Sequence, residues 1–178
     1  KFPISLMVAF SALTGYSLAG IYDLSGIIIL LSGVFLLAGG SSILNQVQEQ
    51  KFDLLMERTR NRPLASGQLS VSVAMAISLI LIFWGGIFLG TLGWLPLLLG
   101  ILNVILYNFV YTPLKRFTWL AIIPGSLVGA ITPVIGWTAG GLSVTRPGIL
   151  FVSLFMALWQ VPHFWLIFMR HSEDYKKA

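Results

Sequence analysis

Three polar residues, Asn45, Glu49 and Asp53, follow one another at intervals of four in the segment NQVQEQKFD. Residues four apart lie on one face of an α-helix, so an amide oxygen and two carboxylates are predicted to project together. Mg²⁺ prefers oxygen ligands from one or two carboxylates, completed by substrate phosphates and water. The spacing therefore predicts a magnesium site.

Arginines follow this acidic face in the segment MERTRNRPL, at Arg58, Arg60 and Arg62. Their planar guanidinium groups match the geometry of phosphate oxygens. Acids that hold a metal beside bases that hold phosphate make up a diphosphate site. The alternative is a solvated loop in which these acids and bases only pair with one another.

Two further polar segments carry similar chemistry. NFVYTPLKR places Tyr111 four residues before Lys115. The last segment contributes His163, Arg170, Glu173 and Asp174. His163 lies within or at the end of an apolar stretch, where an ionisable residue is a candidate for function. Its alternative role is a hydrogen bond to a neighbouring helix.

The chain that must position these groups is strongly apolar. Of its 178 residues 57% are apolar and 10% are charged, whereas a soluble domain averages about 25% charged residues. Charged residues are absent from 24–44, 63–114, 117–145 and 147–169. A membrane-spanning helix needs roughly 20 apolar residues, so the sequence predicts an all-α polytopic membrane protein. The absence of cysteine excludes thiolate chemistry.

Six spans are predicted, at 3–22, 26–48, 71–91, 94–112, 118–140 and 148–169. An even number of spans places the N-terminus and the segments 49–70, 113–117 and 170–178 on one side. That side holds every Lys and Arg except Arg146. Because cytoplasmic loops collect Lys and Arg, the polar segments are predicted to face the cytoplasm.

Four segments in this order, NQVQEQKFDLLMERTRNRPLASG, YTPLKR, GAITPVIGW and PHFWLIFMRHSEDY, resemble the UbiA superfamily of membrane prenyltransferases. Within it they are most similar to the protoheme IX farnesyltransferase (haem O synthase) branch. The resemblance implies a UbiA-like transmembrane helical bundle, with one prenyltransferase domain over residues 1–178. Members have about nine spans, so the chain is expected to be a fragment that lacks the C-terminal spans.

The resemblance also implies a reaction. The farnesyl group of farnesyl diphosphate is transferred to a vinyl group of haem B, with addition of water, giving haem O. Mg²⁺ is the implied cofactor, and haem B is a substrate rather than a cofactor. The expected setting is a bacterial inner (plasma) membrane. The expected partners are the lipid bilayer and a downstream haem-modifying enzyme or oxidase assembly factors, with no nucleic acid.

Residue roles follow from the same resemblance. The implied metal ligands are Asn45, Glu49, Asp53, Glu173 and Asp174. The implied diphosphate-binding residues are Arg58, Arg62, Tyr111, Lys115 and Arg170. The implied catalytic residues are Asp53, Glu49 and His163.

The chain departs from the general superfamily pattern in two places. Glu49 stands where that pattern has Asp, and His163 with the pair Glu173-Asp174 replaces the widely spaced aspartates of the second motif. The haem branch shares the second departure. Two alternatives stay open, namely a UbiA-type enzyme acting on an aromatic quinone precursor and a membrane transporter. A transporter predicts ionisable residues near the bilayer midplane, whereas these lie almost entirely at one interface.

Overall fold

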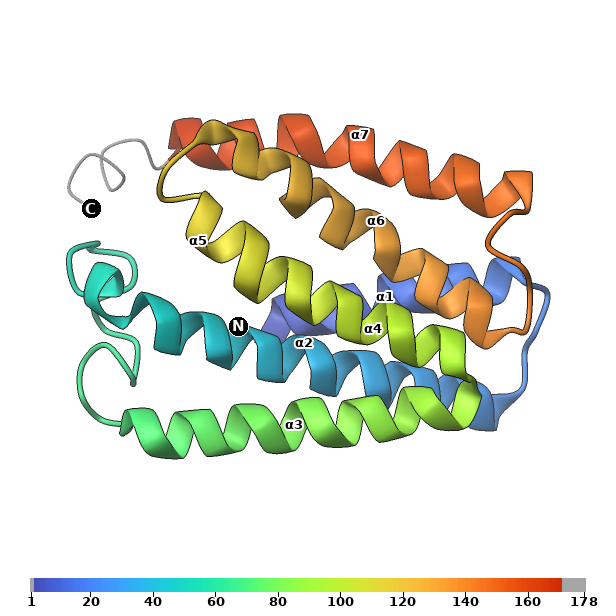
Figure 1. Ribbon diagram of the computed structural model, residues 1–178, viewed down its shortest axis with the longest axis horizontal. Helices are drawn as coiled ribbons and strands as arrows, with labels where there is room; N and C mark the ends of the chain where they lie inside the picture. The colour runs from blue at the N-terminus through green and yellow to red at the C-terminus, as the bar shows by residue number, and fades with distance from the viewer. Residues whose placement is uncertain (1, 171–178) are drawn as a thin grey trace.

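The chain folds into a bundle of long helices that run side by side (Figure 1). The computed structural model describes residues 2–170, apart from the side chains of residues 167, 168 and 170. The α-helices are α1 (Phe2–Leu18), α2 (Leu24–Asp53), α3 (Val71–Leu92), α4 (Trp94–Ile105), α5 (Thr112–Leu114), α6 (Ile122–Ala139) and α7 (Pro147–Arg170). A π-helix, η1 (Leu106–Tyr111), joins α4 to α5, and a 3₁₀-helix, η2 (Trp119–Ala121), precedes α6.

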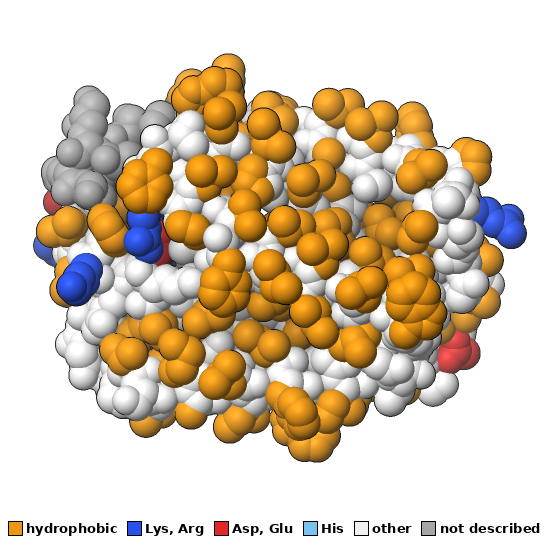
Figure 2. Space-filling model, in the orientation of Figure 1, with side chains coloured by type: hydrophobic (Ala, Val, Ile, Leu, Met, Phe, Trp, Pro, Cys, Tyr) orange, Lys and Arg blue, Asp and Glu red, His pale blue; other side chains and the backbone are white. Residues whose placement is uncertain are grey.

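The predicted all-α membrane fold is confirmed. Within residues 2–170, five helical segments are long and apolar enough to cross a membrane, and α1 is a shorter apolar helix. Apolar side chains cover the broad middle of the surface, and the visible Lys and Arg side chains lie near its two ends (Figure 2). The described residues therefore belong to an integral, multi-pass membrane protein.

Two predicted spans differ from the structure in a way that matters for the site. α2 continues past residue 48 to Asp53, so all three members of the four-residue series lie on one helix. The span predicted at 94–112 is interrupted by the π-helix η1. The backbone hydrogen bonds of η1 join residues five apart, whereas those of an α-helix join residues four apart.

The polar segments gather at one end of the bundle. α2 ends there, followed by the loop 54–70, and α5 and the end of α7 lie at the same end (Figure 1). We call this the polar end. The predicted common side of 49–70 and 113–117 is thus confirmed, whereas residues 171–178 lie outside the described part of the chain.

Glycines bring two pairs of helices into backbone contact. A Cβ on Gly15 of α1 would lie 1.8 Å from the carbonyl oxygen of Pro133, and one on Gly136 of α6 would lie 1.7 Å from that of Ala12. Between α2 and α3, a Cβ on Gly85 would lie 2.8 Å from a backbone oxygen. Small residues give membrane helices this close packing.

Asp23 closes the connection between α1 and α2 at the opposite end. Its side chain caps α2 by accepting the Gly26 N–H, and the Tyr16 hydroxyl and the Ser25 hydroxyl also donate to it. These bonds, that of Tyr16 first, lower the pKa of the Asp23 carboxyl. The carboxylate therefore anchors the first helical hairpin.

We expect Gly136→Ala to destabilise the folded protein by about 1–3 kcal/mol, because the new methyl group meets backbone atoms of α1 that cannot rotate away. Thermal unfolding in detergent, followed by circular dichroism, measures the effect. Gly148→Ala in α7 is the matched control, since no atom outside the adjoining backbone of α7 lies within 4 Å of its Cβ position. Equal melting temperatures for the two variants would contradict the close α1–α6 packing.

Candidate active site

The carboxylate of Asp53 at the end of α2 is held by Arg62. Nη1 of Arg62 donates to both Asp53 oxygens, at 2.8 and 2.7 Å. The intervening loop folds back because the Thr59 hydroxyl donates to the Asp53 carbonyl at 2.9 Å and Gln50 Nε2 donates to the Leu64 carbonyl at 3.0 Å. Asp53 is consequently only 5% exposed, and one predicted phosphate ligand lies beside a predicted metal ligand.

The carboxylate of Glu49 meets bases from a distant segment. Lys115 Nζ donates to Glu49 Oε2 at 2.8 Å, and Asn45 Nδ2 donates to the same oxygen at 3.0 Å. Nε of Arg116 lies 4.0 Å from the other carboxylate oxygen. The predicted shared face of Asn45 and Glu49 is confirmed, although the amide nitrogen of Asn45, not its oxygen, faces the carboxylate.

Arg116 is a member of this cluster that the sequence analysis missed. Its guanidinium carbon lies 4.5 Å from the centre of the Phe52 ring, and Nη2 donates to the Gln48 carbonyl at 2.9 Å. The signal was its position next to Lys115 in YTPLKR. Arg116 thus joins the end of α5 to the end of α2.

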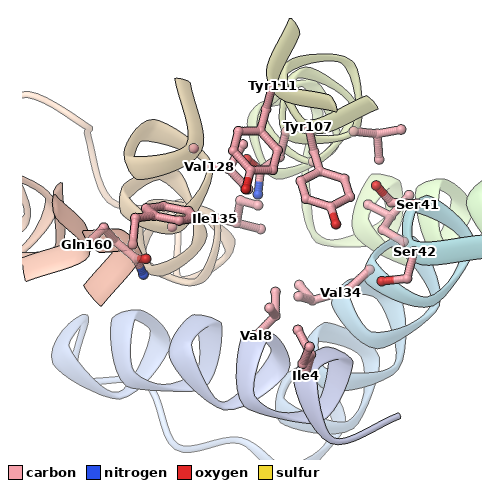
Figure 3. Close-up of a pocket in the computed structure, with 18 of the residues that line it drawn as sticks. Ile4, Val8, Val34, Ser41, Ser42, Tyr107, Tyr111, Val128, Ile135 and Gln160 are labelled. Atoms are coloured by element: carbon pink, nitrogen blue, oxygen red, sulfur yellow. The ribbon is translucent and has the colours of Figure 1, made fainter. Parts of the chain in front are cut away.

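A cavity of about 300 Å³ opens beside the charged cluster. Side chains of α1, α2, α4, η1, α6 and α7 line it (Figure 3). The lining is mainly apolar, with a few polar groups from Ser41, Ser42, Asn103, Gln160 and two tyrosines. Lys115 also lines the cavity, and because it pairs with Glu49 it marks the end of the cavity nearest the carboxylates.

Two tyrosines of η1 form one wall of the cavity (Figure 3). The rings of Tyr107 and Tyr111 stack with centroids 5.6 Å apart and an interplanar angle of 22°. Lys115 Nζ lies 5.4 Å from the centre of the Tyr111 ring, and Phe164 of α7 packs against that ring. Tyr107 was not among the predicted site residues, although the spacing 107, 111, 115 was a usable signal.

The remaining predicted site residues are exposed, or their side chains lie outside the described part of the chain. Arg58 is exposed on the loop 54–70. His163 is exposed on α7 with its ring 6.1 Å from that of Phe164. Arg170 is the last residue of α7, but its side chain is not among those described, and Glu173 and Asp174 lie outside the described residues.

The donor set can be tested against Mg²⁺. Within residues 2–170 no group of three or more His, Cys, Asp or Glu side chains is placed to hold a metal ion. Glu49 and Asp53 would therefore need further oxygens to complete a coordination shell. Mg²⁺ is commonly bound by one or two carboxylates together with substrate phosphates, so this incomplete acidic set fits that ion with a diphosphate.

Curated relatives match the chain over nearly its whole length. It is 45% identical to a protoheme IX farnesyltransferase of Geobacter sulfurreducens over 176 residues, covering 98% of this chain and 65% of the relative. It is 39% identical to the protein of that name from Oleidesulfovibrio alaskensis, covering 100% of this chain and 64% of the relative. The chain thus spans just under two thirds of the length of these relatives.

Solved structures share the fold at lower sequence identity. A structure of digeranylgeranylglyceryl phosphate synthase has a TM-score of 0.83 and 16% identity, covering 99% of this chain and 62% of that one. A UbiA homologue of Archaeoglobus fulgidus, bound to DMAPP and Mg²⁺, has a TM-score of 0.78 and 16% identity, covering 99% and 67%.

The match to a known family extends over the charged cluster and all of the cavity lining except Ile4. The family model described as the UbiA prenyltransferase family matches residues 8–178, which confirms the resemblance seen in the sequence. The chain belongs to the UbiA prenyltransferase family.

Proposed function

We propose that the chain is the larger part of a Mg²⁺-dependent prenyltransferase that transfers a farnesyl group from farnesyl diphosphate to a vinyl group of haem B, giving haem O. One observation supports the proposal most strongly: Asp53 and Glu49 of α2 form ion pairs with Arg62 and Lys115 beside a mainly apolar cavity. The names of the relatives support haem B as the acceptor. Supplying the full-length protein with both substrates and detecting haem O by mass tests the whole reaction.

The diphosphate lies at the polar end in this proposal. Arg62 and Lys115 donate to its oxygens, and each side chain retains partial exposure, at 23% and 25%. Glu49 and Asp53 would hold Mg²⁺, which neutralises charge on the departing diphosphate. The positive-inside rule supports a cytoplasmic location for this end, in a bacterial inner membrane.

The cavity takes the prenyl chain. At about 300 Å³ it lies at the small end of the range of ligand pockets, roughly 300–1,000 Å³. Its apolar lining keeps water away from an allylic cation, and the faces of Tyr107 and Tyr111 attract positive charge. The C–O bond to diphosphate breaks at the cavity mouth, where Lys115 meets both the leaving group and the tyrosine wall.

His163 is the candidate for contact with haem. His163 is exposed on α7, and its ring lies beside that of Phe164. A neutral imidazole can ligate iron or accept a proton near neutral pH. A haem-modifying enzyme or an oxidase assembly factor would receive the product.

Replacing Asp53 by Asn should lower kcat/KM about a hundredfold or more, because a charge that stabilises the transition state is lost while the shape of the side chain is kept. Turnover of farnesyl diphosphate and haem B by the purified variant measures this. Glu57→Gln, an exposed acid on the following loop, is the matched control. Wild-type turnover by a folded Asp53→Asn variant would show that the acids and bases of this segment only pair with one another and take no part in catalysis.

Filling the cavity should change which prenyl donor is used. Ala38 lines the cavity, so Ala38→Phe is expected to lower kcat/KM for farnesyl diphosphate about tenfold relative to geranyl diphosphate. Competition between the two donors gives the ratio directly. Ala76→Phe, on the exposed face of α3, is the control and should leave the ratio unchanged. An unchanged ratio in Ala38→Phe would place the prenyl chain elsewhere.

His163→Ala should weaken haem binding more than binding of a non-hydrolysable farnesyl diphosphate analogue, because imidazole suits iron or a proton better than Mg²⁺. Separate titrations of the variant with haem and with the analogue measure the two affinities. Asp53→Asn serves as the reciprocal control and should show the opposite preference. Equal loss of both ligands in a folded His163→Ala protein counts against a role in haem binding.

A further inference from the structure

A continuous chain of hydrogen bonds, buried at its centre, runs from η1 to the carboxylate of Glu49. The Thr112 hydroxyl donates to the Tyr107 carbonyl at 2.8 Å. Asn45 Nδ2 then donates to Thr112 Oγ1 at 3.0 Å and to Glu49 Oε2 at 3.0 Å. Asn45 and Thr112 are each only 1% exposed, so the bond between them is shielded from water.

The direction of each bond in this chain is fixed by chemistry. The Tyr107 carbonyl can only accept, so it takes the single hydrogen of the Thr112 hydroxyl. That hydroxyl can therefore only accept from Asn45, which must present its amide nitrogen. The second hydrogen of the same nitrogen points at Glu49. Turning the amide over would set its oxygen against a carboxylate and against a hydroxyl that has no hydrogen left.

The π-helix η1 places the hydrogen-bond chain next to the cavity wall and next to a second contact with α2. Residues four apart on an α-helix are offset by roughly 40°, and the wider turn of η1 counters this drift. Tyr107, Tyr111 and Lys115 consequently all line the cavity. On the adjoining face Asn108 donates to the Ser41 hydroxyl, one four-residue step before the contact of Thr112 with α2.

We propose that Thr112 is a positioning residue: it holds Asn45 as a hydrogen-bond donor that orients the Glu49 carboxylate for Mg²⁺ and diphosphate. This inference rests on the proposed function for the identity of the ligands, while the hydrogen-bond chain itself is a property of the protein. Partners that orient metal ligands commonly contribute 10–100-fold to affinity or activity. The Tyr107 carbonyl also accepts the Thr112 backbone N–H, so removing only the hydroxyl leaves the backbone contact in place.

The first measurement tests the hydrogen bond without any ligand. Full-length protein labelled with ¹⁵N-asparagine gives side-chain amide signals, and the pair that disappears in Asn45→Ser belongs to Asn45. We expect Thr112→Val to shift this pair and speed its hydrogen exchange, and Thr112→Ser to restore it. Unchanged Asn45 signals in Thr112→Val would overturn the proposal.

The second measurement tests the effect on the site. We expect Thr112→Val to weaken binding of a non-hydrolysable farnesyl diphosphate analogue with Mg²⁺ about tenfold, with binding recovered in Thr112→Ser. The matched control is Thr138→Val, because that buried hydroxyl donates to carbonyls of its own helix, α6. Wild-type affinity in Thr112→Val would overturn the positioning role. Failure of the wild-type protein itself to bind the analogue would instead overturn the proposed function, and the amide signals would still decide whether the hydrogen-bond chain exists.

Discussion

The pairing of the two α2 carboxylates with bases from other segments is the constraint on which the polar end depends. The side chains of Asp53 and Glu49 are only 7% and 12% exposed. A buried charge without a partner is costly, and breaking such a pair commonly costs about 3–5 kcal/mol. The loop after α2 must therefore return Arg62 to Asp53, and the end of α5 must deliver Lys115 to Glu49. The chain path at this end follows from these two requirements.

Packing within the bundle then decides where the cavity can form. Backbone contacts hold α1 to α6 and α2 to α3, and Ser78 strengthens the second pair by donating to the Gly40 carbonyl at 2.8 Å. Another wall of the cavity carries the tyrosines of η1, which face α1 and α2 (Figure 3). The cavity between these helices is mainly apolar, with Lys115 at one end. An amphiphilic substrate with an anionic head matches that distribution.

Much of this arrangement could be predicted from the sequence. The features that could not be predicted escaped for physical reasons. Long uncharged stretches predict the spans because lipid excludes charge, and the spacing of Asn45, Glu49 and Asp53 predicts their shared helix face. The π-helix leaves no comparable signal, since its residues also suit an ordinary membrane helix. Thr112 was overlooked because it carries no charge, and its importance lies in the direction of one hydrogen. The roles of Glu173 and Asp174 stay predictions, since both lie outside the described residues.

The glycine contacts between α1 and α6 also bear on how the cavity can change during evolution. In glycine a hydrogen occupies the direction of the missing Cβ, so Gly15 and Gly136 each present a Cα–H to a carbonyl oxygen of the other helix. Such contacts contribute about 0.5–1 kcal/mol each, and this reciprocal pair sets the register of α1 against α6 through backbone atoms alone. Cavity-lining side chains elsewhere on these helices, such as Ile4 and Val128, take no part in this backbone contact. A change in the size of these side chains would therefore reshape the pocket while the helix crossing stays fixed.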